Sequence, residues 1–400
     1  MPEDHAPVPK FAVAFRNELA GSGRVGRLPS GAEVPCLTFR DYMRLCLYDP
    51  DCGYYRSGPV RVGRSGDFYT SPFLGETMGE QLAAALWKLA DERFGVGSGA
   101  NVVDWGGGTG RLIRQLGESW GREGASDRFR LFVVEDHPAH RREAEIALRD
   151  RIESGSARIF AEAEAEAYPW RKGNTIVIAN ELLDAFPVHR VVQTEDGLAE
   201  QGVFWDENAG RPAPCLTGLS TPRLAERLAL DGTKLLKGQI AEVGLDAADW
   251  VAGLYGKLGN ALLVILDYGD EAAELTGPHR MEGTLVCYRR HIAHGDPYVL
   301  PGEQDITAHV NFTAIRDAAV HAGWEPLWYG TQQRFLIASG VLDRLAAHAC
   351  TDPFAPVVRR NRQIRQLLLS DGMGELFKVQ IFAKRGCQHG EKERAANKKA

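Results

Sequence analysis

The sequence of 400 residues is 44% hydrophobic and 25% charged, which is the composition of an ordinary globular protein with a sizeable buried core. Its formal net charge of -6 argues against a protein that holds nucleic acid by neutralising phosphates. The longest aliphatic run, residues 261–266, is far shorter than the roughly 20 residues of a membrane span, so we expect no membrane partner.

Residues 1–95 are predicted to form a helical and loop region that packs on the core. Proline and glycine are frequent in residues 1–35, which predicts a loose lead-in with one short helix. Apolar residues at helical spacing predict helices over 38–48 and 78–94, separated by a glycine-rich connection.

The main domain is predicted over residues 96–384, because buried strands and helices alternate there as in a doubly wound α/β fold with parallel strands. The predicted strands are 101–105, 131–135, 157–160, 175–180, 261–267 and 377–383. One helix is predicted to begin at 111 and another to end at 149. Further helices are predicted at 251–258, 313–322 and 342–349.

An insertion is predicted at about 188–250. Its β-rich runs 188–193 and 198–205 are separated by the turn signal Thr-Glu-Asp-Gly, which indicates a hairpin rather than another crossover. Residues 212–249 are interpreted as helical pieces. Two later segments complete the prediction, namely a substrate-facing loop at about 270–312 and a charged, disordered tail at 385–400.

The segment DWGGGTGR, residues 104–111, lies between a buried strand and a helix. Its glycines let the backbone turn sharply and approach a ligand at the start of the helix. The dinucleotide pattern G-x-G-x-x-G fails because Arg111 stands at its third glycine, whereas G-x-G-x-G at Gly106, Gly108 and Gly110 fits. The motif therefore favours S-adenosyl-L-methionine over NAD, although an isolated glycine turn can also serve tight packing alone.

An acidic residue at the end of the next strand can accept hydrogen bonds from the ribose hydroxyls of such a cofactor. Glu135 is the first choice for this role, ahead of Asp136. The gap from Gly106 to Glu135 is longer than the roughly 20 residues of a compact nucleotide fold, and residues 117–127 can supply the extra loop.

Asn180, Glu181 and Asp184 follow a predicted strand at the carboxyl edge where open α/β sheets bind ligands. Asn180 is predicted to contact the cofactor. Glu181 and Asp184 are predicted as the catalytic pair, because carboxylates can hold a guanidinium through paired hydrogen bonds. The alternative is that Asn180 and Glu181 only cap a short helix.

Eight segments in order resemble the MidA-type methyltransferases, a family that includes a mitochondrial complex I assembly factor. The resemblance covers about residues 39–384. The segments are FRDYMRLCLYDPDCGYY (39–55), GDFYTSP (66–72), the glycine loop, ANELLDAFPV (179–188), LDYGD (266–270), GTLVCYRRH (283–291), DITAHVNFT (305–313) and GELFKVQIFAK (374–384).

The resemblance implies a Rossmann-like, seven-stranded class I methyltransferase sheet with a helical N-terminal region and inserted substrate-facing elements. It also implies S-adenosyl-L-methionine as the cofactor and symmetric dimethylation of a protein arginine. Asp104 is expected in the cofactor site, where the family often carries Glu. Asn311 stands where the family often carries Asp, which removes a charge and weakens the case for the same substrate.

Other polar residues are assigned to the two ligands. By resemblance, Asp67 and Thr70 belong to a loop that covers the cofactor, whereas Ser71 before a proline is explained as a helix N-cap. Asp305 and His309 are predicted to bind the substrate, although a lone histidine more often has a structural role.

We predict no metal centre. The pairs His137 with His140 and His291 with His294 have usable spacing, but no cysteine or carboxylate frame completes either site. The seven cysteines form no C-x-x-C pair, and the N-terminus lacks the basic and apolar stretches of a secretory signal. These features predict reduced thiols in a cytoplasmic protein.

The sequence thus predicts an S-adenosyl-L-methionine-dependent methyltransferase that acts on an arginine of a protein of unknown identity. Two alternatives stay open, namely a small-molecule N- or O-methyltransferase and an assembly factor that binds the cofactor with little turnover. A homodimer is left open.

Overall fold

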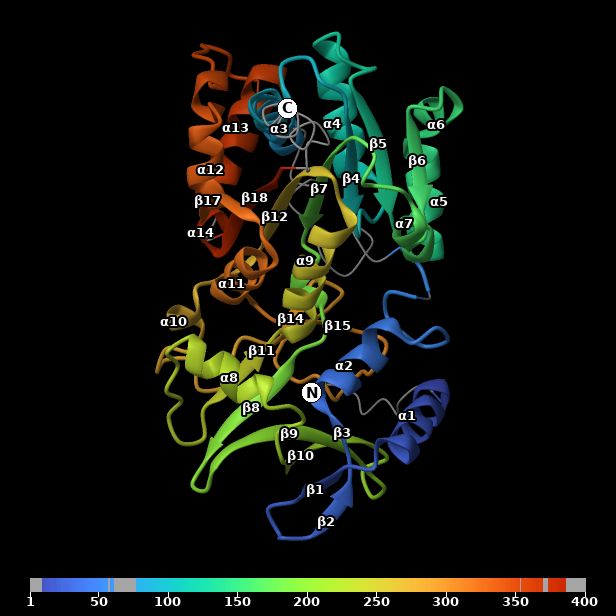
Figure 1. The fold of residues 1–400 in the computed structure, drawn as a ribbon, viewed down its shortest axis with the longest axis vertical. Coiled ribbons are helices and arrows are strands. Elements are labelled where there is room, and N and C mark those ends of the chain that lie inside the picture. The colour runs from blue at the N-terminus through green and yellow to red at the C-terminus, as the bar shows by residue number, and fades with distance from the viewer. Residues whose placement is uncertain (1–8, 57, 61–76, 353, 370–372, 386–400) are drawn as a thin grey trace, which may run out of the picture.

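The computed structural model describes residues 9–56, 58–60, 77–352, 354–369 and 373–385 (Figure 1). Two sheets organise the chain, and they lie one above the other in Figure 1. The upper body contains the larger sheet with helices on both faces, and the lower body contains an antiparallel sheet with the N-terminal elements. Within the described ranges, no helix combines the length and apolarity needed to cross a membrane.

The larger sheet has the strand order β17-β18-β12-β7-β4-β5-β6, with the short β16 beside β12. Its strands are β4 (Ala100–Trp105), β5 (Phe129–Val134), β6 (Ala157–Phe160), β7 (Asn174–Asn180), β12 (Asn260–Asp270), β16 (Val310–Asn311), β17 (Glu325–Thr331) and β18 (Phe377–Lys384). The strands β4 to β7 and β12 are parallel, as predicted, whereas β18 pairs antiparallel with both β12 and β17. The predicted seven-stranded path is therefore confirmed.

Alternation along the strands explains the helices on both faces. In β12, Leu262, Val264 and Leu266 pack into one apolar cluster, and Leu263 and Ile265 pack into the other, because successive side chains point to opposite faces. The first cluster is covered by α3 (Thr77–Phe94), α4 (Arg111–Arg122), α5 (Pro138–Ala147), α12 (Gln332–Ala338) and α13 (Pro356–Leu369). The second is covered by α7 (Glu162–Ala167), α9 (Leu245–Lys257) and α11 (Phe312–Ala322).

The second sheet joins the N-terminal region to the insertion. Its order is β11-β8-β9-β10-β1-β2, with β3 beside β9. The strands are β1 (Val25–Arg27), β2 (Glu33–Pro35), β3 (Leu37–Thr38), β8 (His189–Thr194), β9 (Gly197–Asp206), β10 (Arg211–Thr217) and β11 (Ile240–Val243). The lead-in predicted for residues 1–35 contains its predicted helix, α1 (Pro9–Ser22), but the loose remainder is wrong in the described part, because β1 pairs with β10 and β2.

The predicted helical pieces of the insertion are also wrong in part, because β10 and β11 flank the helix α8 (Arg223–Leu230). Pro212 and Pro214 obscured β10 in the sequence. Both prolines pair with β9, whereas β1 reaches β10 only at Leu216. A proline without an N–H is tolerated where a strand has a neighbour on one side only.

The remaining elements are short. They are α1 (Pro9–Ser22), α2 (Phe39–Tyr48), α6 (Arg149–Glu153), α10 (Ala272–Leu275), α14 (Met373–Leu376), the 3-10 turns Leu183–Ala185 and Val341–Arg344, and β13 (Val286–Arg289), β14 (Ile292–His294) and β15 (Asp305–Thr307). The loop predicted at 270–312 thus contains a small sheet, in the order β14-β13-β15.

The helix predicted at 342–349 is reduced to one of these 3-10 turns. The Asn361 side chain accepts from the Ala346 amide at 3.2 Å and donates to the Ala346 carbonyl at 2.8 Å. These bonds satisfy the two backbone groups that a helix would otherwise pair. The predicted disordered tail lies outside the described residues from 386 onward.

Candidate active site

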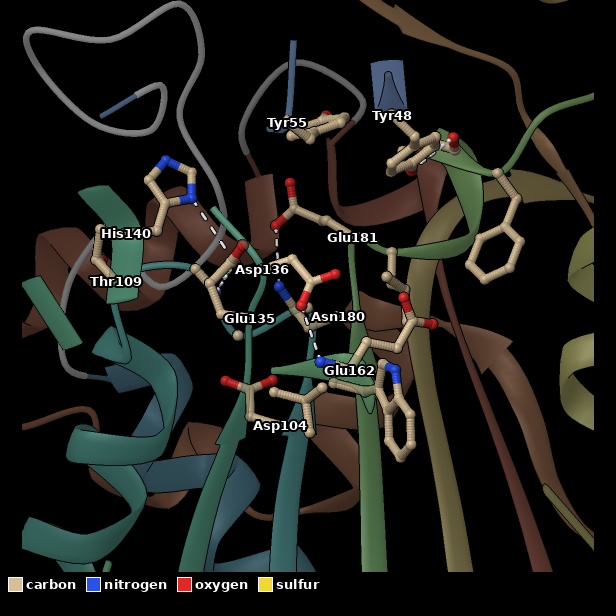
Figure 2. A pocket seen from close by; sticks show the side chains of 18 of the residues that line it. Tyr48, Tyr55, Asp104, Thr109, Glu135, Asp136, His140, Glu162, Asn180 and Glu181 are labelled. Atoms are coloured by element: carbon tan, nitrogen blue, oxygen red, sulfur yellow. Dashed lines mark hydrogen bonds and ion pairs between the residues drawn. The ribbon is translucent and has the colours of Figure 1, made fainter. Parts of the chain in front are cut away.

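A cavity of about 500 Å³ opens where β4, β5 and β7 end. Its lining comes from the glycine loop after β4, the acidic segment after β5, the turn after β7 and the N-terminal region. In Figure 2, Glu181 lies between Asn180 and the pair Tyr48 and Tyr55. The structure thus brings four separate parts of the chain to the carboxyl edge of the sheet, where α/β folds bind ligands.

The glycine loop has a backbone that only glycine adopts without strain. Gly106, Gly108 and Gly110 have φ angles of 71°, 54° and 70°. A Cβ atom at Gly106 would lie 2.7 Å from Leu182 Cδ1, whereas one at Gly108 meets no atom within 4 Å. Since Gly108 lines the cavity, its missing side chain leaves room for a ligand against the loop.

Glu135 supports this loop from the next strand. Its Oε2 accepts from the Gly108 amide at 2.9 Å, and its Oε1 accepts from the His137 amide at 2.7 Å. The second choice, Asp136, forms an ion pair with Arg56 and accepts from the Glu162 amide at 2.8 Å. Both acids line the cavity, and the assignment of Glu135 to a ribose stays a prediction.

Asp104 lies buried beneath the loop. A Cβ atom at Gly107 would lie 3.0 Å from Asp104 Cγ. Burial, assisted by the charge of Glu135, raises the pKa of Asp104 to about 7. The Asp104 carboxylate is therefore easily neutralised by a proton near neutral pH.

Glu181 stands in a strained backbone position directly after β7. Its φ of 52° is one of three positive values among the described non-glycine residues. Such a conformation costs of order 1–3 kcal/mol and persists only where neighbours enforce it. Here the Glu181 amide donates to Leu266 O at 2.8 Å, and Asp267 Oδ2 accepts from the amides of Leu182 and Leu183 at 3.1 and 2.8 Å.

The side chain of Glu181 is held inside the cavity. Its Oε2 accepts from the Tyr268 hydroxyl at 2.9 Å, and its Oε1 accepts from Asn180 Nδ2 at 3.3 Å. Asp267, rather than Asn180 or Glu181, bonds the free amides of the turn that follows. The capping alternative raised by the sequence is therefore not the arrangement found.

Asp184 follows Glu181 in the turn after β7, and it is almost wholly buried, at 5% exposure. Burial raises its pKa well above the ordinary range, and the nearby charges of Asp267, Asp305 and Glu181 raise it further. Within the described part of the chain, its Oδ1 atom has no hydrogen-bond partner. A buried carboxylate oxygen without a donor is a costly feature for a folded protein.

The two predicted substrate residues are separated by the structure. Asp305 is buried on β15 and accepts from the Tyr55 hydroxyl at 2.8 Å, next to the main cavity. His309 lines a second, small cavity, and burial lowers its pKa to about 4. Asn311 caps α11 and donates to Asp231 at 3.0 Å, so its departure from the family pattern has a structural explanation.

Sequence reasoning missed several residues of the cavity, two of them tyrosines. Tyr48 and Tyr55 line the cavity with rings stacked at 5.8 Å, and the Tyr48 hydroxyl donates to Ala185 O at 3.0 Å. Their segment carried part of the family resemblance, and that was its only signal. The predicted cofactor residues Asp67 and Thr70 lie outside the described residues.

Comparisons with known proteins give a consistent result. Residues 77–330 match the model of a family of S-adenosyl-L-methionine-dependent methyltransferases. A Drosophila melanogaster protein named protein arginine methyltransferase NDUFAF7 homolog, mitochondrial, is 27% identical over 361 residues, which cover 77% of this chain and 73% of the relative. The Danio rerio protein of the corresponding name is 26% identical over 367 residues, with coverages of 85% and 82%.

Solved structures extend this similarity to the whole fold. A Burkholderia thailandensis protein, crystallised with S-adenosyl-homocysteine bound, superposes with a TM-score of 0.81 at 30% identity, covering 96% of this chain and 95% of that one. A native crystal structure from the same organism gives a TM-score of 0.78. The predicted cytoplasmic location is contradicted, because the animal relatives are named mitochondrial.

Proposed function

The chain belongs to the family of S-adenosyl-L-methionine-dependent methyltransferases, and from this premise we propose that it methylates an arginine side chain of a protein substrate. The predicted fold, enzyme class and cofactor are confirmed by the family membership. The choice of acceptor is supported by the relatives, which are named protein arginine methyltransferases.

The cavity fits the cofactor in size and in chemistry. A volume of about 500 Å³ lies within the usual range for small-molecule sites. The open space at Gly108 and the neighbouring carboxylate of Glu135 suit a ligand with a ribose and a charged tail. The residues assigned to hold it are Asp104, Gly106, Gly108, Gly110, Glu135 and Asn180, with Asp67 and Thr70 assigned by resemblance. When bound, the cofactor supplies an electrophilic methyl group.

The observation that carries the proposal is a carboxylate, Glu181, fixed in the same cavity as the glycine loop by Tyr268 and Asn180. An arginine guanidinium is protonated at neutral pH and its lone pairs are delocalised. A nitrogen that gains a methyl group must therefore be oriented and must lose a proton. We assign both tasks to Glu181, with Asp184 as the second carboxylate of the acceptor site.

Transfer of labelled methyl groups tests this proposal. The purified chain is incubated with methyl-labelled S-adenosyl-L-methionine and a protein extract from cells that lack the gene, and the proteins are then hydrolysed and chromatographed. We expect labelled methylarginine in the protein fraction. Label in small molecules would favour an N- or O-methyltransferase, and no label from a cofactor-binding chain would favour an assembly factor with little turnover. We further propose that the partner is a protein, with no nucleic acid or membrane, and leave a homodimer open.

A further inference from the structure

Four carboxylates lie near one another at the cavity. Glu181 lines it, whereas Asp184, Asp267 and Asp305 are buried, and the four differ in how many hydrogen-bond donors they meet. Asp267 is saturated, because it accepts from three backbone amides around it. Glu181 and Asp305 each accept from a tyrosine hydroxyl. Asp184 is the exception, since its buried Oδ1 has no donor among the described residues. A buried acid without a donor needs an explanation, and a ligand that donates to it is one such explanation.

Hydrogen bonds join the segments around Asp184. The amide of Ala308, three residues after Asp305, donates to Asp184 O at 2.9 Å, which joins β15 to the turn after β7. Tyr48 bonds Ala185 O, and Tyr55 bonds Asp305, so the N-terminal region reaches the same place. No ion pair to Asp184 is formed within the described ranges, and burial, followed by the neighbouring acids, raises its pKa. The surroundings of Asp184 therefore favour an added positive charge.

We propose that Asp184 and Asp305, walled by Tyr48 and Tyr55, form a cation subsite that holds the guanidinium of the acceptor arginine. This subsite rests on the proposed function and adds to it the residues that would bind the arginine. It also makes the N-terminal region part of the acceptor site. Tyr48 and Tyr55 line the cavity beside Glu181, and aromatic faces attract cations. Tyr55 is a positioning residue, because its hydroxyl holds the carboxylate of Asp305.

The chemistry selects a guanidinium over other acceptors. Its planar fork carries five N–H donors and a charge that is never lost in water, so it can bond more than one carboxylate at once. A lysine ammonium has a compact charge on three donors, and a neutral amine or hydroxyl brings no charge at all. A cationic acceptor offsets the repulsion among acids that are buried together, whereas a neutral acceptor leaves that repulsion to be relieved by protonation of the acids.

The subsite is tested with two matched probes, N-acetyl-arginine amide and N-acetyl-citrulline amide. They have nearly the same shape, but the citrulline group is neutral. Each is titrated onto the full chain saturated with S-adenosyl-homocysteine, with binding followed by calorimetry or saturation-transfer NMR. We expect the arginine probe to bind at least about tenfold more tightly, the effect of one charged hydrogen bond. Equal binding of the probes, or no binding of the arginine probe, would overturn the subsite.

Variants localise the effect. Asp305→Asn is expected to lower the affinity for the arginine probe about tenfold while leaving affinities for citrulline and S-adenosyl-homocysteine unchanged. Asp184→Asn should act in the same direction and provides the second variant if Asp305→Asn fails to fold. An arginine-probe affinity that stays at the wild-type value in either folded variant contradicts the proposal.

Tyrosine variants separate positioning from general damage. Tyr55→Phe keeps the ring and removes the donor to Asp305, so we expect a loss of about threefold in arginine-probe affinity. The control is Tyr298→Phe, whose hydroxyl contacts Gln201 at 3.4 Å, and it should leave binding unchanged. An equal loss in both variants would overturn the positioning role. The probe titrations measure binding without methyl transfer. If the chain binds the arginine probe through Asp305 but labels no protein, the proposed function is contradicted and the cation subsite is not.

Discussion

The two proposed halves of the active site are built in different ways. The proposed cofactor half comes from three adjacent strand ends, with the glycine loop after β4, Glu135 directly after β5 and Asn180 at the end of β7. The proposed acceptor half combines Tyr48, Tyr55 and Glu181, which line the cavity, with the buried Asp184 and Asp305, so it draws on the N-terminal region, the turn after β7 and β15. A local motif therefore specifies the first half, whereas the second half exists only when distant segments meet.

The largest expected effect is loss of cofactor binding, caused by a substitution in the proposed cofactor half. Gly108→Val should abolish binding of S-adenosyl-homocysteine, because a branched side chain would occupy the open space at this position and would adopt a strained φ of 54°. The matched control is Gly210→Val in the β9–β10 turn, where φ is 64° and the space is also open. Calorimetry on both variants checks the prediction. Undiminished affinity at Gly108→Val would refute the cofactor assignment.

The second effect is expected in the acceptor half. Glu181→Gln should lower turnover about a hundredfold at saturating cofactor, which is the scale typical of a positioned acid or base. The amide oxygen can still accept from Tyr268, so the turn after β7 should keep its conformation. Initial rates of protein methylation check this expectation. Normal turnover would remove the main support for a guanidinium acceptor and would favour a small molecule.

The third effect returns to the cofactor half. Glu135→Ala should weaken S-adenosyl-homocysteine by about 1.5–3 kcal/mol, the usual range for a hydrogen bond to a charged group. The variant also leaves the amides of Gly108 and His137 without their acceptor, so the control Glu135→Gln, which keeps one of the two acceptor oxygens, should be milder. Titration calorimetry measures both. A dissociation constant that does not change would move the ribose role elsewhere.

The smallest effect concerns pH. The folded chain holds the proton of Asp104 up to about pH 7, whereas an unperturbed aspartate has a pKa of 3.8. The stability from this raised pKa is complete below pH 3.8 and is lost as pH rises through 7, with a slope of up to about 1.4 kcal/mol per pH unit. Urea unfolding of the ligand-free chain between pH 5 and 6.5 measures this decrease in the free energy of unfolding. Asp104→Asn should make the decrease with pH smaller. An unchanged slope would mean that Asp104 is ionised in the folded chain.

The sequence predicted the sheet, and it brought out the glycine loop and Glu135 of the proposed cofactor half, because each depends on local patterns. Alternating apolar residues specify strands with two buried faces, and three glycines with positive φ specify a loop that leaves room for a ligand. The order of β4, β5 and β7 could also be predicted, since consecutive parallel strands with helical crossovers leave few arrangements.

The acceptor half could not be predicted in the same way. Tyr42 and Tyr48 lie on one amphipathic helix, and yet Tyr42 is core while Tyr48 lines the cavity. Their spacing carries no sign of this difference, because it arises from which segment packs opposite. The sequence likewise gives no sign that Asp267 and Asp184 have different roles. The difference appears only in the structure, where three backbone amides donate to Asp267 and give it a structural role.

One measurement tests most directly whether the two halves bind different molecules, namely the calorimetric affinity of Glu181→Gln for S-adenosyl-homocysteine. Glu181 lines the same cavity as Gly108 and Glu135, so proximity alone would allow it a cofactor role. We predict a dissociation constant within about threefold of the wild-type value, since the carboxylate serves the acceptor. A loss of about thirtyfold or more would assign Glu181 to the cofactor and would contradict the division of the cavity.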